Sequence, residues 1–432
     1  MLINFLNSFQ ISRQRFFTYK YILFFSIPFL LLISFAGCSS SKKFSDEDYN
    51  YNSTAKFKSP DIKVLLDDKP KTKNITLGSN VVLSSADKRI AIVNEGNTLY
   101  ANIDGDKVII TIGDNSFTSE SFKIETKDRN TFLSYNGKSY RGAIKFFSDG
   151  SKLIIINELP LEDYLKGVLP LEMPIGKGDE NVEALKAMAV TARTYSFSKM
   201  NKNNKTFDVY LDVRDQVYGG VKAEKALTNK IIDETKGLIL TYDGKPAIVF
   251  YSASGGGYTE NYKNVFGNFD IPYLRGVKDG DKPYGSIMPN FEWTEKYTEG
   301  KFLSMLLNAG KIKNVNYTID DIEIVSRFAS GRVNELKISL ESDENGDKEI
   351  ILKGNRIRSI IRRANGGILR STMIEIEMDD DKNIEITGKG NGHGVGLSQW
   401  GAIYLSHEGT DYKEILSHYF PGTEIKPISY DN

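Results

Sequence analysis

Pro160-Leu-Glu-Asp-Tyr-Leu-Lys-Gly-Val-Leu-Pro-Leu-Glu-Met-Pro174 is the stretch that decides the fold, because the chain changes there from strand-like to helical patterning. Pro160 suits the first turn of a helix, which predicts a short helix with its apolar residues on one face. Those residues are Leu161, Tyr164, Leu165, Val168 and Leu169. Pro170 and Pro174 predict a non-helical break around Glu172, because proline disfavours a helix at and before its own position.

A longer helix is predicted after this break, with Asp179 as its N-cap. Its small and apolar residues form a narrow stripe that suits close packing: Val182, Leu185, Ala189, Ala192 and Ser196. Further along the chain, strand and helix patterns are intermixed and no repeat period stands out. We expect strands at 237–242, 247–252, 322–327, 335–340 and 384–387, and helices at 301–308, 355–363 and within 397–419.

The segment upstream of the deciding stretch is rich in strand signals. Alternating or β-branched runs, such as 62–66, 90–93 and 108–112, are separated by Asp-Gly and Asn-Gly pairs, which are typical of hairpin turns. We therefore expect a β-rich N-terminal region, residues 60–150, packed on a mixed core, residues 151–432. The predicted fold class is α+β.

The first forty residues carry an export signal. Arg13, Arg15 and Lys20 precede an almost wholly apolar run at 21–35, which ends in small residues before Cys38. This length suits a signal peptide better than a membrane span, and small residues before a Cys resemble the bacterial lipobox. We expect residues 1–37 to be a signal peptide, the Cys38 thiol to carry a lipid, and residues 38–59 to be a flexible tether.

Two alternatives for this segment are an uncleaved N-terminal anchor and a secreted form without lipid, and both place the body outside the cytoplasm. The expected location is the cell envelope, at the outer face of the cytoplasmic membrane or at the outer membrane. The single cysteine excludes an intrachain disulfide and a Cys-rich metal site. The 56 Lys and Arg residues balance 56 Asp and Glu residues, so nucleic acid is not an expected partner.

Glu172 is the candidate catalytic residue. It stands among Leu169, Leu171 and Met173, and apolar surroundings raise the pKa of a carboxyl group toward neutrality. A general acid that protonates a glycosidic oxygen needs such a pKa. The alternative is an ordinary surface glutamate in a loop.

Two further segments combine polar side chains with glycine. The first, 212–220, offers Asp212, Gln216 and Tyr218, which suit hydrogen bonding and stacking with sugar rings, although an ordinary polar loop would look the same. The second, 388–401, presents His393 and Gln399 between a strand and a helix. It superficially matches a dinucleotide fingerprint but has no following βαβ unit, and it lacks the Lys-Ser/Thr of a P-loop.

A serine hydrolase and a zinc enzyme are also possible readings. The segment Ser252-Ala-Ser-Gly-Gly-Gly257 puts serines beside glycines, but it lacks the Gly-x-Ser-x-Gly pattern of a nucleophile elbow. The chain has three histidines, His393, His407 and His418, and none shows metal-ligand spacing. We therefore expect no metal and no cofactor.

Taken together, these segments resemble the SpoIID/LytB family of bacterial envelope proteins. The resemblance covers about residues 62–421 and rests on several motifs in one order. The motifs read Leu161-Glu-Asp-Tyr-Leu-Lys-Gly-Val168, Glu172-Met-Pro174, Ala184-Leu-Lys-Ala-Met-Ala189, Ala192-Arg-Thr-Tyr195, Thr235-Lys-Gly-Leu238 and Gly392-His-Gly-Val-Gly-Leu-Ser-Gln399.

The resemblance implies a lytic transglycosylase that acts on peptidoglycan strands stripped of their peptide stems. The family's catalytic glutamate falls on Glu172, which would act as acid and then as base and leave 1,6-anhydro ends on N-acetylmuramic acid (MurNAc). Other matching positions and their neighbours are candidates for substrate binding. They are Arg193, Tyr195, Asp212, Gln216, Tyr218, Ser254, His393, Ser398 and Gln399.

One departure from the family pattern concerns zinc. Some members carry His and Cys around a Ser-x-x-Gly-Gly turn, whereas Tyr251 and Ser254 stand at those positions here, so no zinc is expected. The family also includes amidase enhancers. The alternative function is therefore a non-catalytic, glycan-binding lipoprotein that enhances an amidase or scaffolds a division or sporulation complex. Expected partners are glycan strands, a membrane through Cys38, and an amidase or other envelope proteins.

Overall fold

The computed structural model describes residues 58–69, 72–86, 88–126, 131–200, 206–267 and 269–428. The predicted signal peptide, Cys38 and almost all of the predicted tether lie outside the described residues. Strands and helices are both abundant, and the strand-rich N-terminal region confirms the α+β class. Within the described part, no helix is both long and apolar enough to cross a bilayer.

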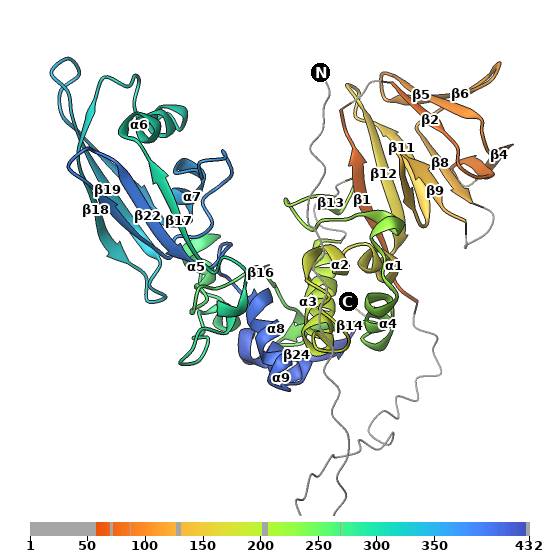
Figure 1. The fold of residues 1–432 in the computed structure, drawn as a ribbon. Helices are drawn as coiled ribbons and strands as arrows, with labels where there is room; N and C mark the ends of the chain where they lie inside the picture. Colours follow the sequence, from red (N-terminus) through yellow and green to blue (C-terminus); the bar gives the residue numbers. More distant parts are fainter. Residues whose placement is uncertain are drawn as a thin grey trace, which may run out of the picture. The chain divides into compact units, whose positions relative to one another are not determined.

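A seven-stranded sheet dominates the N-terminal region (Figure 1). Its strands, in spatial order, are β13 (Val209–Tyr210), β1 (Asp61–Asp67), β12 (Leu153–Pro160), β11 (Ala143–Ser148), β8 (Ser121–Thr126), β3 (Val81–Ser85) and β4 (Lys88–Val93). A second sheet has the order β2 (Lys73–Thr76), β5 (Thr98–Asp104), β6 (Lys107–Ile112) and β7 (Asn115–Ser119), and a small hairpin joins β9 (Leu133–Tyr135) to β10 (Lys138–Tyr140).

Strand β12 ties this region to the core that follows it. Its sequence LIIINELP is buried at six of eight positions, as expected for a strand covered on both faces. It pairs antiparallel with both β1 and β11, although it lies beyond residue 150. Strand β13 also pairs with β1. The N-terminal strands and the core therefore share one sheet.

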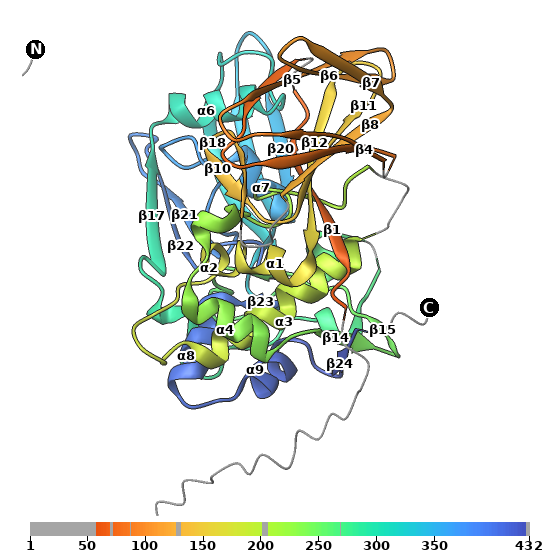
Figure 2. The same ribbon diagram turned by 90° about the vertical axis from the view of Figure 1, so that its right-hand side faces the viewer.

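The helices of the core gather beside β1 and β12 (Figure 2). The long helix α3 packs against the other members of the group. They are α1 (Leu161–Lys166), α2 (Leu169–Glu172), α3 (Val182–Lys199), α4 (Ala226–Glu234), α8 (Gln399–His407) and α9 (Tyr412–Tyr419). A small sheet, β15 (Lys245–Pro246), β14 (Leu238–Tyr242) and β24 (Glu424–Pro427), contacts α3 through β14.

Two local predictions in the deciding stretch are wrong. The predicted break contains the one-turn helix α2, because Pro170 lies in its first turn, where a missing N–H costs nothing. The extended residue that ends the turn is Met173. Helix α3 begins at Val182 rather than after an Asp179 cap, and the Asn181 side chain binds the Pro174 carbonyl oxygen instead of capping the helix.

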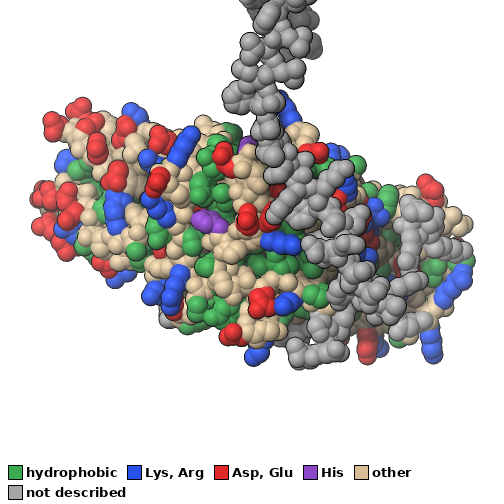
Figure 3. Space-filling view, turned by 90° about the horizontal axis from the view of Figure 1, so that it is seen from below, with side chains coloured by type: hydrophobic (Ala, Val, Ile, Leu, Met, Phe, Trp, Pro, Cys, Tyr) green, Lys and Arg blue, Asp and Glu red, His purple; other side chains and the backbone are tan. Residues whose placement is uncertain are grey.

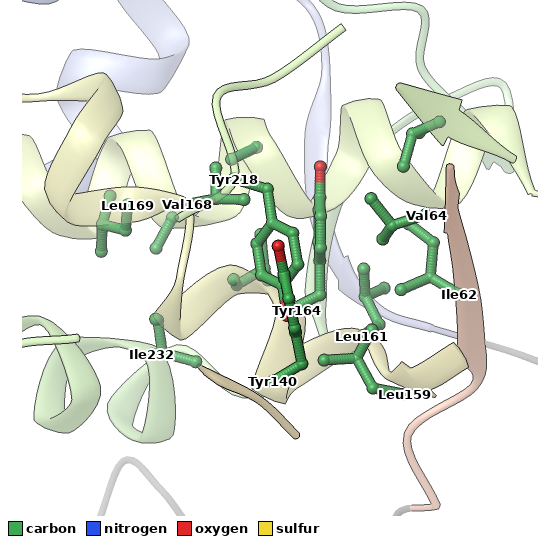
Figure 4. Close-up of a cluster of buried hydrophobic side chains, with 14 of the residues drawn as sticks. Ile62, Val64, Tyr140, Leu159, Leu161, Tyr164, Val168, Leu169, Tyr218 and Ile232 are labelled. Atoms are coloured by element: carbon green, nitrogen blue, oxygen red, sulfur yellow. The ribbon is translucent and has the colours of Figure 1, made fainter. Parts of the chain in front are cut away.

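An aromatic and aliphatic core joins the sheet to the helices (Figure 4). The rings of Tyr140, Tyr164 and Tyr218 lie together, with centroids 5.9 Å and 5.0 Å from that of Tyr218. Leu161 and Val168 surround them from α1 and the turn that follows it. This core fixes the short helices that lead to Glu172.

A buried ion pair crosses the same core. Arg193 of α3 has no exposed surface, and its Nε and Nη2 donate to the two carboxylate oxygens of Glu162 over 2.9 Å and 2.8 Å. Glu162 also accepts a hydrogen bond from the Gly237 backbone N–H, and Arg193 donates to the Leu238 carbonyl oxygen. The pair thus links α1, α3 and the start of β14.

Residues 292–389 form a second hydrophobic core. One sheet has the order β17 (Glu292–Tyr297), β22 (Ile384–Lys389), β21 (Ile374–Met378), and another has the order β18 (Thr318–Arg327), β19 (Val333–Glu341), β20 (Lys348–Lys353). Helix α6 (Glu299–Asn308) matches its prediction, whereas α7 (Ile357–Ile360) is shorter than predicted. The chain then returns to the helices through a glycine-rich loop and β23 (Leu397–Ser398), which pairs with β16 (Tyr251–Ser252).

We expect Glu162→Gln to lower the free energy of unfolding by about 3–5 kcal/mol, because it leaves the buried Arg193 charge without its partner. Urea denaturation followed by circular dichroism measures the change. Lys230→Gln is the control, because Lys230 is an exposed partner of Glu234 and such pairs contribute little. An equal, small effect of both substitutions would contradict this role of the pair.

Candidate active site

Glu172 lines a pocket of about 440 Å³, whose lining residues come from distant parts of the chain. The pocket walls come from α2, α3, the 213–217 loop, β16, α7 and the 391–393 loop. A larger hollow of about 800 Å³ lies on β17 and β22, but it contains none of the site residues predicted from the sequence. The smaller pocket is therefore the candidate active site.

The Glu172 carboxyl group is mostly withdrawn from solvent, and this burial raises its pKa above the ordinary value of 4.5. One hydrogen bond opposes the rise, because the Val217 backbone N–H donates to Oε1 over 2.6 Å and favours the charged form. Its chain neighbours Leu169 and Met173 are buried, whereas Leu171 is 47% exposed. Desolvation dominates the balance, as the sequence analysis expected for this residue.

Tyr251 of β16 also interacts with the Glu172 carboxyl group. Its hydroxyl also opposes the rise in the Glu172 pKa, although it makes no hydrogen bond of ordinary geometry with any described residue. Burial raises the pKa of Tyr251 well above its usual range, so the hydroxyl keeps its proton. Tyr251 thus presents a protonated hydroxyl beside the carboxyl group.

Gln399 holds the backbone of Glu172 in place. It is the first residue of α8, and its Nε2 donates to the Glu172 carbonyl oxygen. Ser398 caps the same helix by accepting a hydrogen bond from the Gly401 N–H, and it also accepts one from the Gly255 N–H. The first turn of α8 is thereby fixed against both α2 and the loop after β16.

Asp215 is the second carboxylate of the pocket wall. It accepts hydrogen bonds from the Tyr195 hydroxyl over 2.7 Å and from the Tyr210 N–H over 2.8 Å, and it pairs with Lys199 over 3.2 Å. These partners satisfy both carboxylate oxygens. Asp215 therefore orders Tyr195, whereas Glu172 is the pocket carboxyl group with a raised pKa.

His393 lines the pocket in its neutral form. Burial and the nearby charges of Arg358 and Arg332 lower its pKa to about 3. Its Nδ1 accepts a hydrogen bond from the Val395 N–H over 3.0 Å, and its ring meets that of Phe266 edge-on. At neutral pH, this imidazole is therefore uncharged and is not an imidazolium acid.

Other sequence-predicted residues lie in the core or beside the pocket. Arg193 is spent in its ion pair with Glu162, and Gln216 is fully buried, accepting hydrogen bonds from Ser196 and Tyr164. The Tyr218 hydroxyl donates to the Asn157 side-chain oxygen over 2.9 Å. These three side chains support the walls and do not face the cavity.

Asp212 and Ser254 also stand away from the carboxyl group of Glu172. Asp212 forms a two-pronged ion pair with Arg214, whose guanidinium lies 3.7 Å from the centre of the Tyr210 ring. Ser254 is buried, and its backbone pairs with Asn391 in an isolated bridge. Of the nine predicted binding residues, the pocket brings together Tyr195, His393 and Gln399.

Several pocket residues had escaped prediction as site residues. Asp215 and Arg214 lie inside the polar segment 212–220, in which the sequence pattern indicates their neighbours Asp212 and Gln216. Tyr251 had been noted only as a replaced metal ligand. Arg358 lies far from Glu172 in the sequence, and no local pattern marks it as a site residue. Among the described residues, no three His, Cys, Asp or Glu side chains gather to hold a metal ion.

Comparisons with known proteins show which family the chain resembles. A family model described as stage II sporulation protein matches residues 149–242, which include Glu172, and a model described as a domain of unknown function matches residues 286–396. An uncharacterized protein of Brachyspira hyodysenteriae is 35% identical over 71% of this chain and 76% of its own.

Two further relatives carry functional names. Stage II sporulation protein D of Bacillus amyloliquefaciens is 32% identical over 62% of this chain and 75% of its own. The amidase enhancer of Bacillus subtilis is 31% identical over 77% of this chain, which spans only 50% of that protein. The family match and these relatives show that the chain belongs to the SpoIID family.

Proposed function

We propose that this protein is a peptidoglycan lytic transglycosylase with Glu172 as its acid and base. Membership of the SpoIID family supports a peptidoglycan-related role. The observation that carries the finer proposal is the Glu172 carboxyl group, whose pKa burial raises inside a pocket. A protonated carboxyl group in a cleft is what cleavage of a glycosidic bond requires.

The pocket favours a one-carboxylate reaction over hydrolysis. A glycoside hydrolase needs a second carboxylate as nucleophile or base, and Asp215 is engaged by Tyr195, Lys199 and a backbone N–H. In the proposed reaction, Glu172 gives its proton to the oxygen between MurNAc and N-acetylglucosamine (GlcNAc), and the C1–O bond breaks. The MurNAc C6 hydroxyl attacks C1, its proton passes to the Glu172 carboxylate, and a 1,6-anhydro ring closes.

Tyr251 and Gln399 have defined parts in this scheme. The protonated Tyr251 hydroxyl can donate a hydrogen bond to the strand beside the reacting oxygen. Gln399 fixes the Glu172 backbone, so the carboxyl group keeps one position through both proton transfers. Neutral His393 adds no competing acid at neutral pH.

A second candidate function rests on the similarity to the amidase enhancer of Bacillus subtilis. In that case the pocket would hold a glycan strand without cutting it, and the protein would stimulate an amidase. Purified protein would then release no sugar fragments from peptidoglycan, but it would raise the rate of an added amidase. Mass spectrometry of the soluble products separates the two functions.

We also propose that the protein is exported and anchored by a lipid on Cys38. The basic residues, the apolar run and the small residues before Cys38 support this location. A lipid anchor would keep the pocket near a membrane surface, within reach of the wall.

Glu172→Gln is expected to lower the rate of release of 1,6-anhydro products from peptide-free glycan at least about 100-fold, because the amide cannot transfer a proton. Chromatography coupled to mass spectrometry measures the products. Glu408→Gln, the same change at an exposed residue of another surface, should leave the rate unchanged. Full release of anhydro products by Glu172→Gln would refute the assignment.

The pH profile should show activity falling as the pH rises through the pKa of Glu172, because the reaction begins from the protonated acid. Since burial raises that pKa, the fall should lie above the pH at which an ordinary glutamate with a pKa of 4.5 loses its proton. Tyr251→Phe removes a hydroxyl that lowers the Glu172 pKa, so it should move the fall to higher pH. An unmoved or downward-shifted profile would contradict this coupling.

Because burial raises the Glu172 pKa, we also predict that Glu172→Gln does not lower thermal stability at neutral pH. Burial penalises the charged carboxylate in the folded state, and glutamine keeps an oxygen that accepts the Val217 hydrogen bond. A melting temperature equal to or above that of the unmodified protein would therefore show that lost activity is a chemical effect.

Cys38→Ser should abolish incorporation of a labelled fatty acid and move the protein from the membrane fraction to the soluble fraction. The reason is that Cys38 is the single thiol in the chain. Gel fluorography and fractionation of cells measure the two effects, with Ser40→Ala as the control. Labelling that persists in Cys38→Ser would rule out this anchor.

A further inference from the structure

The Glu172 pocket adjoins a second hollow of about 620 Å³. Phe266, Arg358 and Ile368 line both cavities and form their common wall. Two of these residues belong to the segment 286–396, which matches a domain of unknown function. The second domain therefore supplies part of the wall of both cavities, which together are called the groove, with the hollow as its extension.

The extension is basic. Its lining contains Lys263, Lys353, Arg356 and Arg358 and no acidic residue. The same domain also carries exposed acidic residues outside this lining, for example Asp343, Glu344 and Asp347. Figure 3 shows acidic side chains gathered toward one end of the face that it draws. The positive lining is thus a local feature of the groove in a chain whose charges balance overall.

Arg358 is the unusual member of this lining, because it is buried without a counter-charge. It is 9% exposed, and it makes no ion pair with any described carboxylate. Its Nε donates to the Leu369 carbonyl oxygen over 2.8 Å, and its Nη1 donates to the Asn355 side chain over 3.3 Å. Burial lowers the pKa of Arg358 to about 10, so the group still carries its charge at neutral pH.

This arrangement differs from the protein's structural arginine. Arg193 is also buried, but both of its forked N–H groups meet the carboxylate of Glu162. A buried cation that lacks such a partner is costly, and an anionic ligand that enters the groove would supply the missing charge. Arginine is well suited to this purpose, because its planar fork matches a carboxylate.

The residues that flank Arg358 suit the apolar faces of sugar rings. Phe266 is 42% exposed and Ile368 is 51% exposed, although both border the cavities. The Phe266 ring stacks on Phe250 with centroids 4.4 Å apart and planes 16° apart, which fixes its orientation. A rigid aromatic surface beside a cation can hold a sugar that carries an acidic group.

We propose that Arg358 binds a carboxylate attached directly to a sugar of the strand, and that this groove selects an acidic glycan over a neutral one. The inference deepens the proposed function and rests on the glycan occupying the Glu172 pocket. Because Arg358 lies in the wall and not on a protruding surface, its ligand must arrive on a short arm. A lactyl carboxylate on a muramyl ring fits that requirement, whereas a carboxylate at the end of a peptide stem would lie further out.

The first test varies the ligand and keeps Arg358 intact. Full-length Glu172→Gln protein in detergent, which should not turn over the strand, is titrated with three GlcNAc–MurNAc oligomers of equal length. One carries free lactyl carboxylates, one carries their methylamides, and one carries peptide stems. We expect the free-carboxylate oligomer to bind about 10- to 100-fold more tightly than the other two, as for loss of a hydrogen-bonded charge.

Each alternative result of this titration overturns the proposal. Equal affinity for the acid and the methylamide would show that the groove does not read the carboxylate. Binding of the peptide-bearing oligomer as tightly as the free acid would place the recognised anion on the peptide. Both results are obtained with Arg358 unchanged, so misfolding of an Arg358 variant cannot obscure them.

The second test asks whether Arg358 is the residue responsible. In the Glu172→Gln background, Arg358→Gln should weaken binding of the acidic oligomer to the level of the methylamide and leave the methylamide affinity unchanged. A merely structural role would weaken both. Arg362→Gln is the matched control, because Arg362 is an exposed arginine of the same domain outside both cavities, and it should preserve the preference. A preference that survives Arg358→Gln would overturn the assignment.

Catalysis is measured separately, so the two proposals can fail independently. Protein with intact Glu172 that cleaves acid and methylamide strands at equal rates would support the lytic function and reject the role of Arg358. Protein that prefers the acidic strand but releases no anhydro product would support the groove assignment and reject the lytic function.

Discussion

The ion pair between Arg193 and Glu162 is the interaction on which the rest of the core depends. It lies where α1, α3 and the start of β14 meet, and its hydrogen bonds reach the backbone of residues 237 and 238. Helix α3 in turn packs against α8, whose first residue fixes the backbone of Glu172. A charge pair that does not line the pocket thereby sets the position of the carboxyl group, since a shift of α3 would move both sides of the pocket.

The environment of Glu172 is a balance between opposing effects. Withdrawal from solvent favours the neutral acid, while the Val217 N–H and the Tyr251 hydroxyl favour the carboxylate. The proposed role of Glu172, as acid and then as base, is favoured by this balance, because neither form is stabilised excessively. Asp215 differs from Glu172, because an ion pair and two hydrogen bonds hold its side chain in the pocket wall.

The sequence allowed prediction of the α+β class, the β-rich N-terminal region and the special position of Glu172, because periodicity and proline placement are local signals. It failed where tertiary contacts decide. Arg193 matched a family motif and was expected near the substrate, yet a carboxylate thirty-one residues earlier holds it in the core. Arg358 lines the pocket although it lies far from Glu172 in the sequence, so no spacing of residues predicts that the two are close. Helix α2 was missed because Pro170 at a first turn and a proline that breaks a helix look alike in one dimension.

The contact between Gln399 and Glu172 joins residues 227 positions apart. Every stage of synthesis before the ribosome reaches α8 therefore leaves the α2 backbone without its clamp and the pocket without one wall. A nascent chain, or one clipped ahead of its last helices, has the carboxyl group but lacks the cavity that tunes it. The Glu172 pocket therefore gains this wall only when α8 has folded against α2.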